Sequence, residues 1–163
     1  MTMNGTVSLH KYCLLKYFHV GENVARGGQV AQSSIGWQGN PERAIDGNRA
    51  SHWSHGSCTH TMKDANPWWR VDLQKTYKVH SVKITNRKDC CSERINRAEI
   101  RIGNSLKDNG NGNPMYALIA CFAGIGPEGN RDNIFKTDIG LQHALYYSYF
   151  DSDTMFCVLQ QHL

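Results

Sequence analysis

The chain has 163 residues, of which 40% are hydrophobic, and its 18 basic and 14 acidic residues leave a formal net charge of +4. This length predicts one domain with room for a packed core, which excludes wholesale disorder. The basic residues are spread out and no apolar stretch approaches the length of a bilayer span, so a nucleic-acid arm, a polybasic membrane segment and a transmembrane protein are excluded.

Short strand-like segments follow an N-terminal stretch, residues 1–21, which shows no clear period and is predicted to be a tail. In chain order, the sequence predicts strands at 28–34, 68–73, 79–86, 98–103, 118–122, 146–150 and 155–159. Apolar and polar residues alternate in several of them; Trp69, Val71 and Leu73, for example, fall on one predicted face. Because no long segment has a helical period, the pattern predicts an all-β sandwich or barrel.

The six cysteines are an even number, which favours an oxidised, extracellular protein with up to three disulfides in any of 15 pairings. Cys58 lies between two histidines but has no CxxC partner, so a zinc site there is disfavoured. The first 20 residues contain no clean signal-peptide core. The true start could lie upstream, the protein could leave the cell by another route, or it could stay inside.

Cys90 and Cys91 are adjacent, and Arg87 and Arg94 flank them. A trans peptide holds neighbouring Cα atoms about 3.8 Å apart, below the range of about 4.4 to 6.8 Å that is usual for bridged cysteines. A bond between them would therefore be strained, and such strain tends to occur at functional sites. It would form a rigid, apolar, exposed ledge. The alternatives are that each cysteine pairs elsewhere or that both are free.

Four segments together resemble an F-type lectin (fucolectin) domain: ENVARGGQVAQSS, AIDGNRASHWSHGSCTH, ANPWWRVDL and ITNRKDCCSERINRAEIRIGNSL. The resemblance runs from about Glu22 to Cys157, so residues 22–163 are predicted to be one such domain. The spacing of the basic residues fits the family pattern, since His60 precedes Arg87 by 27 positions and Arg94 follows seven later.

The resemblance implies a discoidin-like jellyroll β-sandwich whose loops at one end bind terminal L-fucose. His60, Arg87 and Arg94 would form the basic triad that binds the sugar. Guanidinium forks suit this task because they give strong, directional hydrogen bonds. Supporting roles would fall to Asp89, which orients one arginine, to the Cys90–Cys91 ledge against the apolar edge of the sugar, to Trp53 near its methyl group, and to Trp37 near the tip of the short first binding loop, Ile35–Pro41.

The resemblance also implies a structural calcium ion under the binding loops. Its ligands would be the carbonyls of Arg43, Asn48 and Cys157, the Asp46 side chain, and Ser57. Cys58 would form a disulfide with Cys157, whereas Cys13 and Cys121 have no family partner. Val158 stands where the family has an acidic ligand, so the ion would be held weakly or not at all. The alternative is a plain Asx-Gly turn at Asp46–Gly47.

These features predict a secreted lectin that recognises fucosylated glycans, acts in innate recognition or agglutination, and is not an enzyme. Because one shallow site binds cells poorly, a homo-oligomer or a longer protein with tandem domains is expected. One alternative is a discoidin-like adhesion module that has lost sugar binding and recognises protein or anionic lipid. The other is an enzyme, either a dithiol redox centre at Cys90–Cys91 or a thiol hydrolase that uses Cys58 with a histidine.

Overall fold

Antiparallel strands make up most of the fold. The computed structural model describes residues 22–79, 81–95, 97–118, 132–136, 141–148, 155–156 and 158–162. The strands are β1 (Gln29–Gln32), β2 (Thr59–His60), β3 (Trp68–Lys78), β4 (Ser81–Thr85), β5 (Glu99–Gly103), β6 (Met115–Leu118), β7 (Asp132–Lys136), β8 (Leu141–Ser148), β9 (Met155–Phe156) and β10 (Val158–His162). Helical structure in these ranges is limited to short 3-10 turns: η1 (Val24–Gly27), η2 (Pro41–Ala44), η3 (Trp53–His55), η4 (Ser92–Ile95) and η5 (Lys107–Gly110).

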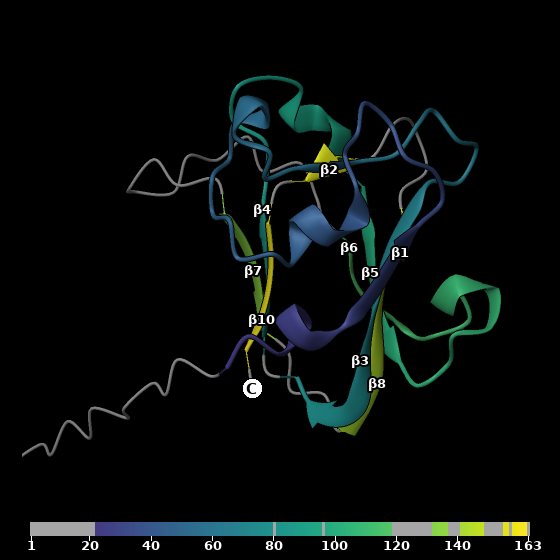
Figure 1. Cartoon of the computed structure of the whole chain (residues 1–163). Helices are drawn as coiled ribbons and strands as arrows, with labels where there is room; N and C mark the ends of the chain where they lie inside the picture. Colours follow the sequence, from purple (N-terminus) through teal and green to yellow (C-terminus); the bar gives the residue numbers. More distant parts are fainter. Residues whose placement is uncertain are drawn as a thin grey trace, which may run out of the picture.

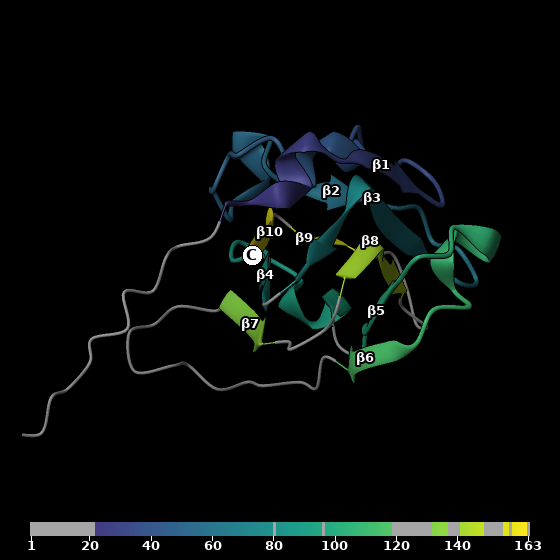
Figure 2. The ribbon, with the colours of Figure 1, turned by 90° about the horizontal axis from the view of Figure 1, so that it is seen from below.

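The described strands form two main sheets, which lie on opposite sides of the molecule (Figures 1 and 2). One sheet has the order β1-β3-β8-β5-β6 and the other the order β10-β4-β7, while β2 and β9 form a separate pair. All of these pairings are antiparallel. The predicted all-β class is therefore confirmed.

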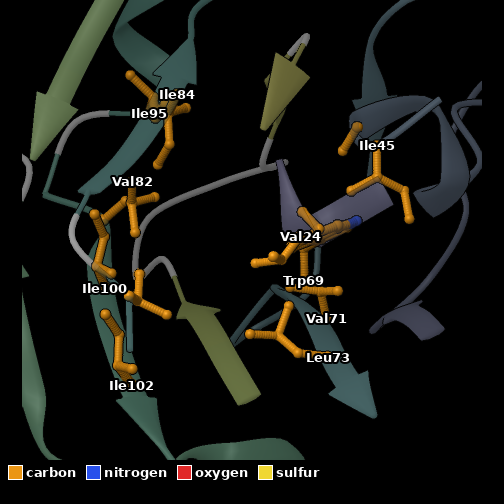
Figure 3. Close-up of a cluster of buried hydrophobic side chains, with 14 residues drawn as sticks. Val24, Ile45, Trp69, Val71, Leu73, Val82, Ile84, Ile95, Ile100 and Ile102 are labelled. Atoms are coloured by element: carbon orange, nitrogen blue, oxygen red, sulfur yellow. The ribbon is translucent and has the colours of Figure 1, made fainter. Parts of the chain in front are cut away.

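A hydrophobic cluster of the described residues lies between the two sheets (Figure 3). Trp69, Val71 and Leu73 of β3 contribute to it as their alternation predicts, since their neighbours on the other face are only half-buried. The members labelled in Figure 3 from the other strands are Val82 and Ile84 of β4 and Ile100 and Ile102 of β5. Burying each large apolar side chain contributes about 1.5 to 3 kcal/mol, so this cluster holds the sheets together.

Several elements differ from the expected ones. The third strand continues to Lys78, beyond the predicted end at Leu73. Strand β7 was not expected, and β8 begins at Leu141 although the predicted strand begins at Tyr146. The predicted tail, residues 1–21, lies outside the described residues, as do Cys13, Cys121 and Cys157.

The two ends of the sandwich carry different elements. The strand β2 and the turns η3 and η4 lie at the upper end in Figure 1, whereas η1 lies at the lower end beside β10, which it contacts. Among the described residues there is no helix with the length and apolar character needed to cross a membrane. The upper end is built from loops that the strands hold in place, and the residues singled out by the sequence gather there.

Candidate functional site

His60 lies on β2 with only 2% of its surface exposed. Its backbone N–H donates to the carbonyl of Gly39 (2.9 Å), and its own carbonyl accepts from the N–H of Gly36 (2.8 Å). The side-chain amide of Gln32 donates to the carbonyls of both His60 and Gly39, at 3.0 Å each. The loop 35–41 therefore holds the His60 backbone from both sides, which fixes where the imidazole can lie.

Arg87 and Asp89 form a two-point ion pair in the segment after β4. The Nε and Nη2 atoms of Arg87 donate to Oδ1 and Oδ2 of Asp89, at 2.8 and 2.6 Å. Oδ1 also accepts from the backbone N–H of Trp53 (3.1 Å). The bond from Arg87 is the main reason that the pKa of Asp89 lies well below its usual range. The Asp89 carboxylate therefore stays charged at ordinary pH and sets the plane of the Arg87 guanidinium.

Arg94 and the two adjacent cysteines lie on the next stretch of chain. The Nη1 atom of Arg94 lies 3.4 Å from Nε2 of His60, and the backbone N–H of Arg94 donates to the carbonyl of Cys91 (3.2 Å). A disulfide joins Cys90 to Cys91, and Cys90 is exposed. The side chain of Asn86 donates to the carbonyl of Ser92 (2.7 Å), which closes this segment into a compact turn.

The side chain of Trp53 lies between the Arg87–Asp89 ion pair and the Arg94–His60 contact. Its ring meets the His60 ring edge-on, with centroids 5.8 Å apart and an angle of 77° between the planes. The guanidinium carbon of Arg87 lies over the same indole, 5.4 Å from its centroid, and so does that of Arg43. The structure thus brings into one cluster the predicted residues His60, Arg87, Arg94, Asp89, Cys90, Cys91 and Trp53.

Trp37 occupies a different position from the rest. It stands at the tip of the loop 35–41 with a φ of +48° and 79% of its surface exposed. The neighbouring Gly36 is bonded to His60, so Trp37 borders the cluster without forming part of it.

The loop 43–57, which carries most of the predicted calcium ligands and is called the cation loop below, has several oxygen atoms on its turns. Asp46 accepts from the backbone N–H of Asn48 at Oδ1 (2.7 Å), which is an Asx turn, and Gly47 follows Asp46 with a φ of +91°. The side-chain amide of Asn48 donates to the carbonyl of His55 (2.9 Å). Within the described residues, no three His, Cys, Asp or Glu side chains gather as metal ligands, so an ion here would rely mainly on carbonyl and hydroxyl oxygens.

The hydroxyl of Ser57 supports a fit to a hard cation. Ser57 is fully buried, and its Oγ is 3.5 Å from the carbonyl of His52 and 3.7 Å from Sγ of Cys58, both long contacts. A buried hydroxyl gains from a closer partner, and oxygen ligands on turn residues suit calcium. The residues present therefore fit the expected ion, with Asp46 as the one carboxylate among the described candidates.

Cys58 is also held in a disulfide. Its expected partner, Cys157, lies outside the described residues. The strands next to these two cysteines are paired, because Thr59 of β2 lies opposite Phe156 of β9. The pairing keeps the site-bearing strand β2 next to the last part of the chain.

The cluster suits a small, neutral, hydroxyl-rich ligand. It combines two guanidinium groups and an imidazole, which exchange hydrogen bonds with hydroxyl groups, with the apolar surface of a disulfide and an indole. Two contributors went unrecognised in the sequence. Gln32 carries no motif, and the side chain of Arg43 acts across the fold, so no local pattern identifies either of them.

Comparisons with known proteins show what the chain is similar to. The family described as "NedA-like, galactose-binding domain" matches residues 43–119. The chain is 52% identical over 106 residues to Fucolectin-1 of Anguilla japonica, covering 62% of this chain and 60% of that protein. It is 50% identical over 107 residues to Fucolectin of Anguilla anguilla, covering 63% of this chain and 68% of that protein.

Among solved structures, the fold matches a fucolectin from the serum of Morone saxatilis, the striped bass, with a TM-score of 0.78 and 37% sequence identity. That match covers 87% of this chain and 48% of the striped bass chain. This chain thus spans about 60% of the length of Fucolectin-1 and about half of the striped bass protein. The discoidin-like arrangement expected from the sequence is confirmed by this match.

Proposed function

This chain belongs to the fucolectin family of F-type lectins, and we propose that it is a lectin that binds terminal L-fucose on glycans. The observation that carries the proposal is the meeting of the Arg87–Asp89 ion pair, Arg94 and His60 beside an exposed disulfide. The names of the relatives and the identity of about half of the aligned residues support it.

Each group has a distinct task in the proposed complex. Arg87 and Arg94 donate hydrogen bonds to the sugar's hydroxyl and ring oxygens, and Asp89 keeps Arg87 in place so that little ordering is needed when the sugar arrives. The imidazole of His60 contacts a hydroxyl group. The Cys90–Cys91 disulfide packs against the apolar edge of the sugar, and Trp53 lies near its methyl group.

A calcium ion belongs to the proposal as a structural element. Arg43, Asn48 and Cys157 would hold it through carbonyl oxygens, Asp46 through its carboxylate and Ser57 through its oxygen atoms. When bound, such an ion supplies positive charge that ties the loop 43–57 together. Val158 brings no oxygen ligand, so this ion is expected to bind more weakly than one with a second carboxylate.

The proposal also covers where and how the protein acts. An exposed disulfide and a second one at Cys58 support an oxidising, extracellular setting. The ligands would be fucosylated glycans, and the outcome would be recognition or agglutination of cells that carry them. Because the cluster suits a bound polyol rather than a reacting one, we propose that the protein binds its ligand without converting it.

A titration of L-fucose into the purified protein tests the proposal. The variant Arg94→Ala removes one charge-assisted bond, worth about 1.5 to 3 kcal/mol, so the affinity should fall about tenfold to a hundredfold while the melting temperature stays near that of the native protein. Arg101→Ala is the matched control, because Arg101 pairs with Glu99 on β5 and not with the cluster. A native protein that binds no fucosylated glycan on an array would overturn the proposal, and so would near-native affinity in Arg94→Ala.

A further inference from the structure

Two guanidinium groups lie over one indole at the site. The Cζ atoms of Arg43 and Arg87 are each 5.4 Å from the centroid of Trp53, within the distance of about 6 Å at which a cation is attracted to an aromatic ring. Asp89 fixes Arg87 independently. Arg43 comes from a different part of the fold, the turn η2, so its contact with Trp53 is a second and separate constraint on the indole.

We propose that the side chain of Arg43 is a positioning residue for the sugar site, which acts by holding the Trp53 indole in place. This inference rests on the proposed function and adds a residue to it. Arg43 need not touch the sugar. It fixes the ring that meets the imidazole of His60 edge-on and lies under Arg87, so the three groups stay aligned when no ligand is present.

The stem of Arg43 is well anchored. Its neighbour Ala44 is fully buried, and Pro41, at the start of the same turn, is buried as well. The carbonyl of Pro41 accepts a hydrogen bond from Nε1 of Trp69 (3.1 Å), a residue of the hydrophobic cluster. The core therefore fixes the backbone of η2, and the Arg43 guanidinium reaches from this turn to the Trp53 ring.

Apart from Arg43, the groups that contact the Trp53 ring include His60 and Arg87, which belong to the proposed sugar site themselves. The N–H of Trp53 is bonded to Asp89, but this bond leaves the side-chain torsions of Trp53 open. The residue is half-buried and lies in a short 3-10 turn, so the protein interior encloses only part of it. A cation over the ring favours one orientation, and a ring that is already oriented loses less entropy when a sugar binds.

The backbone around Arg43 should not depend on its side chain. Ala44, Pro41 and the Trp69 bond remain when Arg43 is shortened, so Arg43→Ala should keep the fold. Arg43→Lys keeps a positive charge near the ring and should recover most of the effect. Arg49→Ala is the control for net charge, because Arg49 is an exposed arginine six positions further along the chain.

The experiment is a double-mutant cycle read by fucose titration and by the near-ultraviolet circular dichroism of the sugar-free protein. Arg43→Ala should weaken fucose binding about three- to tenfold and change the tryptophan signal, while Arg43→Lys and Arg49→Ala stay near native. In a Trp53→Ala background, the further change Arg43→Ala should alter neither quantity. Melting curves confirm that each variant is folded.

Unchanged affinity in Arg43→Ala would overturn the inference. An equal loss in the Trp53→Ala background would also overturn it, because Arg43 would then act by a route other than the indole. If the native protein does not bind fucose, the proposed function is wrong and the role of Arg43 in sugar affinity falls with it. The dichroism still decides in that case whether Arg43 orders Trp53, so the two failures are told apart.

Discussion

The imidazole of His60 has a restricted choice of protonation state. Its Nε2 lies 3.4 Å from Nη1 of Arg94, and a guanidinium has donors but no acceptor. A hydrogen bond between them therefore requires Nε2 to accept, which places the single proton of a neutral ring on Nδ1. A proton on Nε2 would leave two donors facing each other, so protonation of His60 would break this hydrogen bond.

Fucose affinity should fall in acid, because a protonated His60 would be repelled by the positive charge of Arg94. The ionisation of Asp89 does not change over the pH range of this experiment. Its pKa is lowered, so the carboxylate that fixes Arg87 stays charged throughout and becomes protonated only in much stronger acid. Titrations between pH 8 and pH 5 measure this. A constant affinity over that range would show that His60 only donates.

The loop 35–41 determines the position of the His60 backbone. An added Cβ at Gly39 would lie 2.6 Å from both the Cβ and the backbone nitrogen of His60, which no structure tolerates without a shift. An added Cβ at Gly36 would also be too close, at 2.9 Å from Nδ1 of His60. The close approach of two glycines explains why the loop can be short and still hold the ligand-binding strand.

Gly39→Ala should therefore displace His60, with a loss of stability of about 1 to 3 kcal/mol and a clear loss of fucose affinity. Gly112→Ala is the matched control, because a Cβ there meets nothing within 4 Å. Denaturant unfolding and sugar titration measure the two effects. A Gly39→Ala protein with native affinity would show that the loop does not position His60.

The cation loop should make the stability of the protein depend on calcium. Calcium should raise the melting temperature in proportion to the logarithm of its concentration, because it binds only the folded loop. Asp46→Asn keeps the acceptor of the Asx turn but removes the charge, so the calcium shift should shrink or vanish. Asp72→Asn is the control, since Asp72 accepts from the N–H of Gln74 in a similar turn on β3. No shift at millimolar calcium would mean that the loop binds no ion.

Strict alternation of apolar and polar residues made some strands easy to predict, whereas an irregular extension and a short strand were missed. The buried face of β3, with Trp69 and Val71, was predictable because every second residue is apolar. Its extension to Lys78 was not, because Gln74 adopts a φ of +62° and interrupts the register with β8, and such an irregularity leaves no period. Strand β7 was missed because it has only five residues of mixed polarity.

In the site, too, features with a regular spacing along the chain were predictable and contacts between distant segments were not. The family pattern of one histidine and two arginines identified His60, Arg87 and Arg94, because their spacing is visible along the chain. The contact between Arg43 and Trp53 could not be predicted, since it depends on how the turns η2 and η3 approach each other in three dimensions. For Arg43 the sequence indicated only a carbonyl oxygen.

For the molecule as a whole, the part of the chain that the structure describes offers one proposed sugar site, which limits how strongly one chain binds a cell surface. A small neutral sugar leaves little free energy after ordering costs, whereas clustered sites raise avidity by roughly 10² to 10⁴. We therefore expect a homo-oligomer, or tandem copies in a longer protein. Cys13, for which the sequence predicts no partner, is a candidate link between chains.

Light scattering with and without reductant, beside agglutination of fucosylated red cells, measures this valency. Agglutination should follow the oligomer and disappear if reductant yields monomers. A strict monomer that still agglutinates cells would contradict the expectation, since one site does not bridge two surfaces.

The turn η1 and the strand β10 contact each other at the end of the sandwich away from β2, so the first and last described segments lie opposite the proposed sugar site (Figure 1). This arrangement allows another protein to be fused to the domain away from the proposed sugar site. A cargo joined directly before residue 22 or after residue 162, such as a fluorescent protein or a bead tether, would start on the side opposite that site. The fucose affinity of such a fusion should match that of the isolated chain, which makes the domain suitable as a genetically encoded stain for fucosylated surfaces.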